Sequence, residues 1–187
     1  MLRKILIALV VLVLVFVGFV ATRPAHFNIE RSAQIAASPE GIYPHVADFH
    51  QWADWSPWDK IDSTMVKTIT GDAMAVGSEY HWVGTGEAGE GRMTITATTP
   101  PNSLTIKLDF LKPFVATNTT AFAIDGSADG STVKWTMSGE NNFMAKAMGV
   151  FMNMDQLVGG DFEKGLEDLK RITEAEAAAA VDTTASM

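Results

Sequence analysis

Near the end of the chain, apolar residues recur at intervals of three and four, the spacing of one face of an α-helix. The stripe consists of Phe143, Ala147, Phe151, Met154, Val158, Phe162, Gly165, Leu169 and Ile172. Because charged residues occupy the opposite face, the pattern predicts one long amphipathic helix, or a shorter helix that runs into a longer one. Such a helix requires an apolar surface to lie against.

Two glycines, Gly159 and Gly160, interrupt this predicted helix. Each costs about 1 kcal/mol relative to alanine in a helix interior. The pair therefore indicates that backbone or a ligand approaches the helix closely.

The middle of the chain alternates apolar and polar residues with a period of two, which is typical of half-buried strands. Residues 27–35 form the first predicted strand. Ser38-Pro39-Glu40 then starts a short helix with an N-cap serine and a proline at its first position. Six further strands are predicted over residues 65–70, 78–83, 92–98, 103–110, 114–124 and 132–138.

The apolar positions of these strands share one face of the predicted sheet. They are Tyr80, Trp82, Met93, Ile95, Ala97, Leu104, Ile106, Leu108, Phe110, Phe122, Ile124, Val133, Trp135 and Met137. Consecutive hairpins with one apolar face predict a bent antiparallel sheet of about seven strands. The sheet would wrap around the long C-terminal helix, which makes the fold class α+β.

A membrane element is predicted at the N-terminus. Ile5–Ala21 is an uncharged run of seventeen residues, preceded by Arg3 and Lys4 and followed by Arg23. Its length favours an uncleaved single-pass anchor over a removed signal peptide. The basic residues before the run predict a cytoplasmic N-terminus and a domain outside the cell membrane, in the periplasm. The predicted division is 1–23 anchor, 24–176 folded domain and 177–187 disordered tail.

The charge distribution limits the partners. The chain has a formal net charge of −8, and all 22 acidic residues follow position 29. Nucleic acid is therefore not an expected partner, because its binding requires a basic surface. No cysteine is present, so disulfides and zinc–thiolate sites are excluded.

An aromatic segment, residues 49–58, contains Phe49, Trp52, Trp55 and Trp58. Ser56-Pro57 favours a loop here. The segment has two interpretations, a packed aromatic cover over one end of the core or a portal for an apolar ligand. Packing is favoured, since tryptophan is usually part of a core or its rim.

Several motifs are similar to one known group. They are Ile35-x-Ala-Ser-Pro-Glu, Trp52-x-x-Trp55-Ser-Pro-Trp58, Gly77-Ser-x-Tyr-x-Trp82, Gly91-x-Met93-x-Ile95, Leu108-x-Phe110-x-x-Pro113, Val133-x-Trp135-x-Met-x-Gly139 and Asp161-Phe162-Glu163-x-Gly165-Leu-x-x-Leu169-Lys170. Over residues 26–174 the chain resembles the SRPBCC or START-like superfamily, in its polyketide cyclase/dehydrase and lipid-transport branch. The resemblance implies a helix-grip fold that holds a hydrophobic molecule between sheet and helix. It supplies no catalytic residue.

The predicted ligand-binding residues come from the inner sheet face, the aromatic segment and the apolar helix stripe. They are Trp55, Trp58, Tyr80, Trp82, Ile95, Ile106, Leu108, Asn118, Thr120, Phe122, Trp135, Met154, Val158 and Phe162. Asn118 and Thr120 are candidates to orient the polar end of a ligand; the alternative is that they bond to each other or to water. Asp48 and His50 are expected at the mouth of the cavity.

Other chemistry is weakly supported. The spacing of His45-x-x-Asp48-x-His50 fits no familiar metal motif, and such residues near a turn usually cap backbone groups. The glycine-rich run 84–91 carries two glutamates and no following helix, so a nucleotide site is not expected. No nucleophile–base set is recognisable, and neither a catalytic residue nor a cofactor or metal is predicted.

The leading hypothesis is membrane-anchored binding of a hydrophobic small molecule that is lipid-like or isoprenoid-like. One alternative is a cyclase/dehydrase-type enzyme that acts on an aromatic or polyketide-like substrate. Another is a protein-interaction module whose pocket is filled by its own side chains. The oligomeric state stays open.

Overall fold

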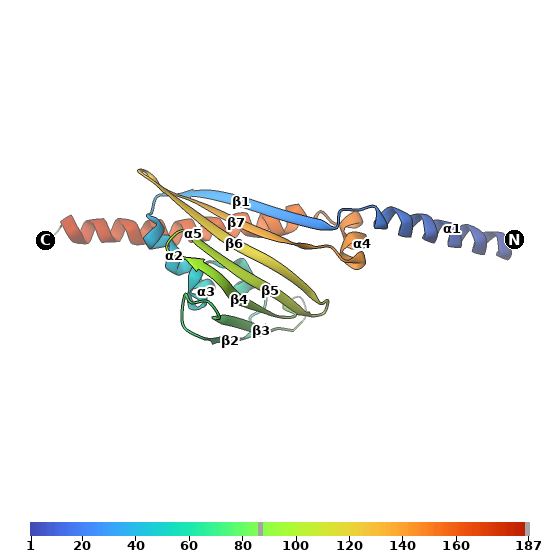
Figure 1. The fold of residues 1–187 in the computed structure, drawn as a ribbon, viewed down its shortest axis with the longest axis horizontal. Coiled ribbons are helices and arrows are strands. Elements are labelled where there is room, and N and C mark those ends of the chain that lie inside the picture. The colour runs from blue at the N-terminus through green and yellow to red at the C-terminus, as the bar shows by residue number, and fades with distance from the viewer. Residues whose placement is uncertain (86–87, 186–187) are drawn as a thin grey trace.

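Seven antiparallel strands form one sheet in a computed structural model that describes residues 1–85 and 88–185 (Figure 1). The strands are β1 (His26–Ile35), β2 (Val66–Thr70), β3 (Glu79–Val83), β4 (Glu90–Thr99), β5 (Ser103–Lys112), β6 (Ala116–Ser127) and β7 (Gly130–Glu140). Their order is β1-β7-β6-β5-β4-β3-β2, a meander whose last strand also pairs with the first. The predicted α+β class and strand number are confirmed.

The inner face of the sheet carries the apolar alternation that the sequence predicts. Phe122 lies directly opposite Trp135 in the β6–β7 register, and both are buried. One predicted inner residue is wrong, because Ala97 is exposed. A register shift between Ile95 and Ala97 in β4 moves the side chains that follow to the opposite face.

Five α-helices accompany the sheet: α1 (Leu2–Ala21), α2 (Pro39–Ala47), α3 (Trp52–Trp55), α4 (Phe143–Phe151) and α5 (Met154–Ala185). The N-cap of α2 is Ser38, whose side chain accepts a hydrogen bond from the Gly41 N–H at 3.4 Å. This start matches the prediction. Helix α5 crosses the inner side of the sheet and packs on β1, α2 and α3 (Figure 1).

The aromatic segment is helical rather than the predicted loop. Two 3₁₀ turns, Phe49–Gln51 and Pro57–Lys60, flank α3. The indole N–H groups of Trp52 and Trp55 donate to the carbonyl oxygens of Val46 (3.0 Å) and His45 (2.9 Å). These bonds satisfy the indoles inside the core, so the packing interpretation holds for both tryptophans.

The C-terminal apolar stripe lies on two helices, the second alternative of the prediction. The Asn142 side chain caps the start of α4. Asn153, the residue before α5, accepts a hydrogen bond from the Gln156 N–H at 3.2 Å and caps the first turn of α5 in the same way. Met152 between them is extended. This break turns α4 away from the sheet, so the predicted burial of Phe143, Phe151 and Met154 is wrong. The stripe is buried from Phe162 to Leu169.

The end of α5 also differs from the prediction. The helix continues to Ala185, where a disordered tail was expected from residue 177. The run of alanines after Glu176 has the highest intrinsic helix propensity, which accounts for the extension. Residues 186–187 lie outside the described residues, as do residues 86–87 of the glycine-rich run.

The two glycines of α5 have different surroundings. Gly159 is buried beneath the guanidinium of Arg31, which pairs with Asp155 (3.1 Å) and Glu163 (2.6 Å). Gly160 is exposed, and a side chain there would meet nothing within 4 Å. The predicted close approach is found at Gly159, although the neighbour is the Arg31 side chain and not the backbone or ligand expected, and it is wrong for Gly160.

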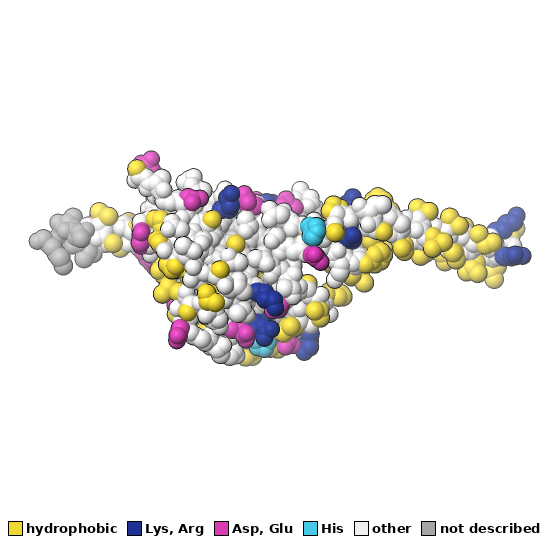
Figure 2. Space-filling view, in the orientation of Figure 1, with side chains coloured by type: hydrophobic (Ala, Val, Ile, Leu, Met, Phe, Trp, Pro, Cys, Tyr) yellow, Lys and Arg dark blue, Asp and Glu magenta, His cyan; other side chains and the backbone are white. Residues whose placement is uncertain are grey.

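Helix α1 extends away from the domain and exposes nearly all of its apolar side chains (Figures 1 and 2). Its length and composition fit a membrane anchor and equally a signal sequence. Its last turns touch the domain: Val20 is fully buried, and the Phe16 ring lies 6.1 Å from that of Phe151 in α4.

Candidate functional site

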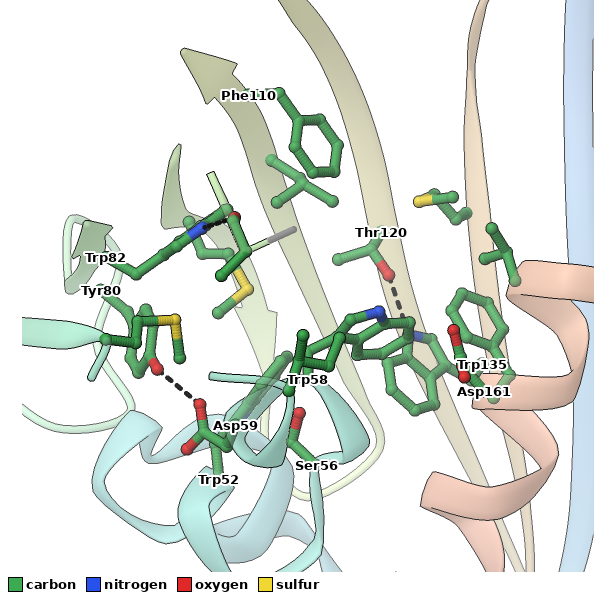
Figure 3. A pocket seen from close by; sticks show the side chains of 18 of the residues that line it. Trp52, Ser56, Trp58, Asp59, Tyr80, Trp82, Phe110, Thr120, Trp135 and Asp161 are labelled. Carbon is green, nitrogen blue, oxygen red and sulfur yellow. Dashed lines mark hydrogen bonds between the residues drawn. The ribbon is translucent and has the colours of Figure 1, made fainter. Parts of the chain in front are cut away.

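A cavity of about 380 Å³ lies between the inner sheet face, the start of α5 and the 3₁₀ turn Pro57–Lys60 (Figure 3). Eight predicted ligand-binding residues line it: Trp58, Tyr80, Trp82, Leu108, Thr120, Trp135, Val158 and Phe162. Lining residues that the sequence reasoning did not propose are Trp52, Ser56, Asp59, Ile61, Met65, Ala88, Met93, Phe110, Met137, Leu157 and Asp161.

Four predicted residues lie behind the cavity wall instead. Trp55, Ile95, Ile106 and Phe122 are at most 1% exposed and belong to the packed core. Trp55 and Phe122 contact edge to face, with ring centroids 6.1 Å apart. Because α3 fills this part of the sheet face with its tryptophans, no space remains for a ligand there.

One wall of the cavity is a cluster of stacked rings. Trp135 lies parallel to Phe162 at 4.2 Å between centroids, which joins the sheet to α5. Trp58 packs edge-on against both rings, at 5.4 Å and 5.8 Å. These contacts make the wall rigid and apolar.

Thr120 contributes a hydroxyl that is already hydrogen-bonded. It accepts from the Trp135 indole N–H at 2.9 Å (Figure 3) and donates to the Thr136 carbonyl at 2.8 Å. Its role is therefore to orient Trp135. Asn118, the other predicted polar contact, lies outside this cavity, with its amide nitrogen 4.0 Å from the Met137 sulfur.

An acid and a phenol face each other at the opposite side of the cavity. The Tyr80 hydroxyl donates to Asp59 at 2.5 Å (Figure 3), and Lys67 lies 3.0 Å from the same carboxylate. Burial, followed by the hydrogen bond to Asp59, raises the pKa of Tyr80 well above its ordinary value. Tyr80 is thus a neutral donor at physiological pH.

Asp161 is the second acid of the cavity and comes from α5. Within the part of the chain that the structure describes, it has no hydrogen-bond or ion-pair partner. Burial raises the pKa of its carboxyl above the ordinary value. Figure 3 shows it beside Trp135, at the helix edge of the site.

A second cavity, of about 930 Å³, adjoins the first at the end of the domain where α1 and α4 lie. The two cavities share Ala88, Phe110, Met137 and Val158. Asn118 and Met154, both predicted ligand contacts, line this second cavity.

The histidines and acids of the α2 region act locally. Asp48 accepts from the backbone N–H and the ring Nδ1 of His50, at 3.0 and 2.8 Å, while His45 contacts Glu176 at 2.9 Å. Asp48 and His50 line neither cavity, so their expected place at the mouth is wrong. Within residues 1–85 and 88–185, no three His, Cys, Asp or Glu side chains gather as metal ligands.

A bent antiparallel sheet closed by a long C-terminal helix, with an apolar cavity between them, defines the helix-grip class of START-like proteins. The chain belongs to the polyketide cyclase / dehydrase and lipid transport family, whose model matches residues 26–174. The resemblance drawn from the sequence motifs is thereby confirmed. No curated protein matches the chain in sequence.

Solved structures share the fold at low identity. Protein CV1439 from Chromobacterium violaceum is 14% identical, with a TM-score of 0.57 over 79% of this chain and 96% of that one. SA2116 from Staphylococcus aureus, a protein of unknown function, is 12% identical, with a TM-score of 0.59 over 82% of this chain and 96% of that one. The di-domain aromatase/cyclase StfQ of the steffimycin pathway is 11% identical, with a TM-score of 0.59 over 82% of this chain and 52% of the StfQ chain. At these identities the likeness shows the fold alone.

Proposed function

We propose that the protein binds a hydrophobic small molecule, lipid-like or isoprenoid-like, in the cavity beneath α5 while α1 anchors it to a membrane. The observation that carries the proposal is the cavity itself. Its volume of about 380 Å³ falls within the range of small-molecule sites. Its wall is largely aromatic and aliphatic, with few polar groups, which suits a ligand held by apolar area at about 25 cal/mol per Å².

The family description, which combines cyclisation with lipid transport, is consistent with this proposal. A protein-interaction module with a filled pocket is less well supported, because the side chains around Trp58 and Leu108 leave the space open.

A cyclase/dehydrase-type enzyme is the second candidate, and Asp161 favours it. This carboxyl faces an aromatic cavity with a raised pKa, which is a property of general acids. The aromatase/cyclase StfQ shares the fold. An aromatic or polyketide-like substrate would place its carbonyl oxygen at Asp161 and its rings against Trp135 and Phe162.

Filling the cavity tests the leading proposal. Leu108→Trp adds a large ring to a residue that lines the first cavity only, so the full chain in detergent should lose most of its uptake of a dansyl-labelled fatty acid. Val66→Trp on β2, where the side chain is exposed, is the control and should bind like the parent. Retained probe is measured by direct excitation of the dansyl group after free probe is removed.

A turnover assay beside the uptake assay separates the two candidates. Asp161→Asn should leave uptake nearly unchanged in either case, because one polar group contributes little beside the apolar area. Only an enzyme turns over a polyketide-like substrate in the parent and loses that turnover in the variant. Equal uptake by the Leu108→Trp variant and the parent would contradict binding in this cavity.

A further inference from the structure

Exposed large apolar side chains concentrate at one end of the domain, around the second cavity. The β5–β6 turn contributes Phe114 (59% exposed) and Val115 (72%). Helix α4 contributes Phe143, Met144 and Phe151, which are 50%, 54% and 78% exposed. These five residues are called the apolar end surface below. Exposed apolar patches of this kind mark interaction surfaces.

The apolar end surface is continuous with α1. Phe151 contacts Phe16 of α1, and Val20 is fully buried where α1 meets the domain. Figure 1 shows α1 leaving the molecule at this end, and Figure 2 shows apolar side chains running from the domain onto the helix. Whatever environment surrounds α1 therefore also reaches α4 and the β5–β6 turn.

Basic side chains outnumber acidic ones among the residues at this end, although Lys112 is paired with Glu90 at 2.6 Å. Arg23, Lys112 and Lys146 line the second cavity, and Glu140 is the only acid among its described lining residues. The whole chain carries −8. Basic side chains next to exposed aromatic and aliphatic ones are typical of surfaces that lie on anionic bilayers.

The second cavity also leads inward. It shares Phe110, Met137 and Val158 with the first cavity, so a route from the apolar end surface to the aromatic wall at Trp135 would pass these three apolar side chains. The outer part of this route is bordered by Phe114, Met148 and Phe151. Arg23, Lys112 and Lys146 are the basic side chains of the second cavity, and a lipid head group would remain beside them while its chain moves inward.

We propose that the apolar end surface docks on an anionic bilayer and that the second cavity is the passage by which a lipid-like molecule moves between that bilayer and the first cavity. The passage rests on the proposed binding function; the docking does not. Phe114, Val115 and α4 reach the interface of the bilayer, and Arg23, Lys112 and Lys146 lie at the depth of the lipid phosphates.

Docking is measured directly in the full chain. Because the chain has no cysteine, Val115→Cys and Val76→Cys each give one labelling site for an environment-sensitive fluorophore. Both valines are exposed, and Val76 lies in the β2–β3 turn, outside both cavities. In nanodiscs that contain anionic lipid, spin-labelled lipids should quench the label at Val115 and leave the label at Val76 bright. Equal quenching at the two positions overturns docking.

The passage is measured as a transfer rate. The double variant Phe114→Asp/Val115→Asp should slow the transfer of the dansyl fatty acid from anionic vesicles by about tenfold, because apolar groups that enter the interface are lost. Its equilibrium uptake in detergent should equal that of the parent, since neither residue lines the first cavity. Asp substitutions at Val66 and Val83, both exposed on other strands, are the control pair.

Transfer by the double variant at the parent's rate overturns the passage. If the parent takes up no probe in detergent, the proposed binding function fails and the passage fails with it. Quenching at Val115 then still decides whether the apolar end surface lies on the bilayer.

Discussion

The polar residues of the first cavity differ in how fully their bonding is satisfied. Thr120 is bonded on both sides, to Trp135 and Thr136, so it belongs to the wall. Tyr80 is held by Asp59, and Asp161 has no partner within the described part of the chain. Sequence alternation placed Thr120 and Tyr80 correctly on the inner face. It did not find Asp161, because a charged residue beside an apolar stripe looks like any solvated helix position.

Removing the Tyr80 hydroxyl should destabilise the fold in a pH-dependent way. Tyr80→Phe deletes the bond to Asp59, and a hydrogen bond to a charged group contributes about 1.5–3 kcal/mol. The pKa of Tyr80 is raised in the folded state, so this stabilisation is complete below pH 10 and is lost as the pH rises beyond it. Urea unfolding of the parent should therefore show stability that falls above pH 10.

Tyr43 also has a pKa raised by burial, and these are the two tyrosines of the chain. Tyr43→Phe thus isolates the titration of Tyr80, which absorbance near the phenolate band follows. Ionisation of Tyr80 at an ordinary tyrosine pKa, without unfolding, would contradict the role given to burial and Asp59.

Among the elements, α5 is the one that covers the cavity, and Arg31 of β1 fixes its first turns. The Arg31 guanidinium pairs with Asp155 and Glu163 on either side of Gly159. A Cβ at Gly159 would lie 2.1 Å from Arg31 Nη2, whereas Gly160 faces open space. Replacing these two neighbouring glycines by alanine should therefore change the stability of the protein differently.

Gly160→Ala should stabilise the protein by about 1 kcal/mol, the difference in helix propensity. Gly159→Ala should forfeit that gain, because Arg31 must leave its two carboxylates. Both are measured by urea unfolding of the full chain in detergent. In an Arg31→Ala background, the two substitutions should change the free energy of unfolding by the same amount. A double-mutant cycle gives this result when the difference between the two glycines comes from direct contact with Arg31. A persistent difference there would place the cause elsewhere.

The strands show what a sequence can predict about elements. Alternation gave every strand to within a few residues, since one buried face determines the phase. It failed at Ala97, where a bulge changes the phase without a compositional sign. The C-terminal apolar stripe predicted α5 correctly but overestimated the burial of the residues before Val158. The caps at Asn142 and Asn153 divide this stretch into two helices, and the stripe does not show that division. The cavity lining could not be predicted from the sequence. Trp55 and Trp58 are the same residue type in the same segment, and only the packing of the folded chain places Trp55 in the core and Trp58 in the cavity wall.

At the scale of the whole molecule, the apolar helix α1 leaves one end of the domain along the long axis (Figure 1), and the apolar end surface and the second cavity lie at that same end. The first cavity adjoins the second. Acidic side chains are spread over the face of the domain that Figure 2 shows, and Glu140 and Glu90 belong to the same end as the second cavity. The order of these elements suits the proposed exchange of an apolar ligand with a membrane.

The orientation of the whole chain is predicted by its first residues. Arg3 and Lys4 precede the apolar run of α1 and outnumber Arg23 behind it, so the N-terminus should remain in the cytoplasm and the domain should lie outside. A cysteine at Val76, in a chain with no other, should then react with a membrane-impermeant maleimide in cells whose outer barrier is permeable. Cytoplasmic thiol proteins in the same cells serve as the control and should stay unlabelled. Protection of Val76→Cys until the cells are lysed would reverse the orientation. A mature N-terminus near Thr22 would show instead that α1 is removed as a signal sequence, and the docking of the apolar end surface would then have to hold the domain to lipid without an anchor.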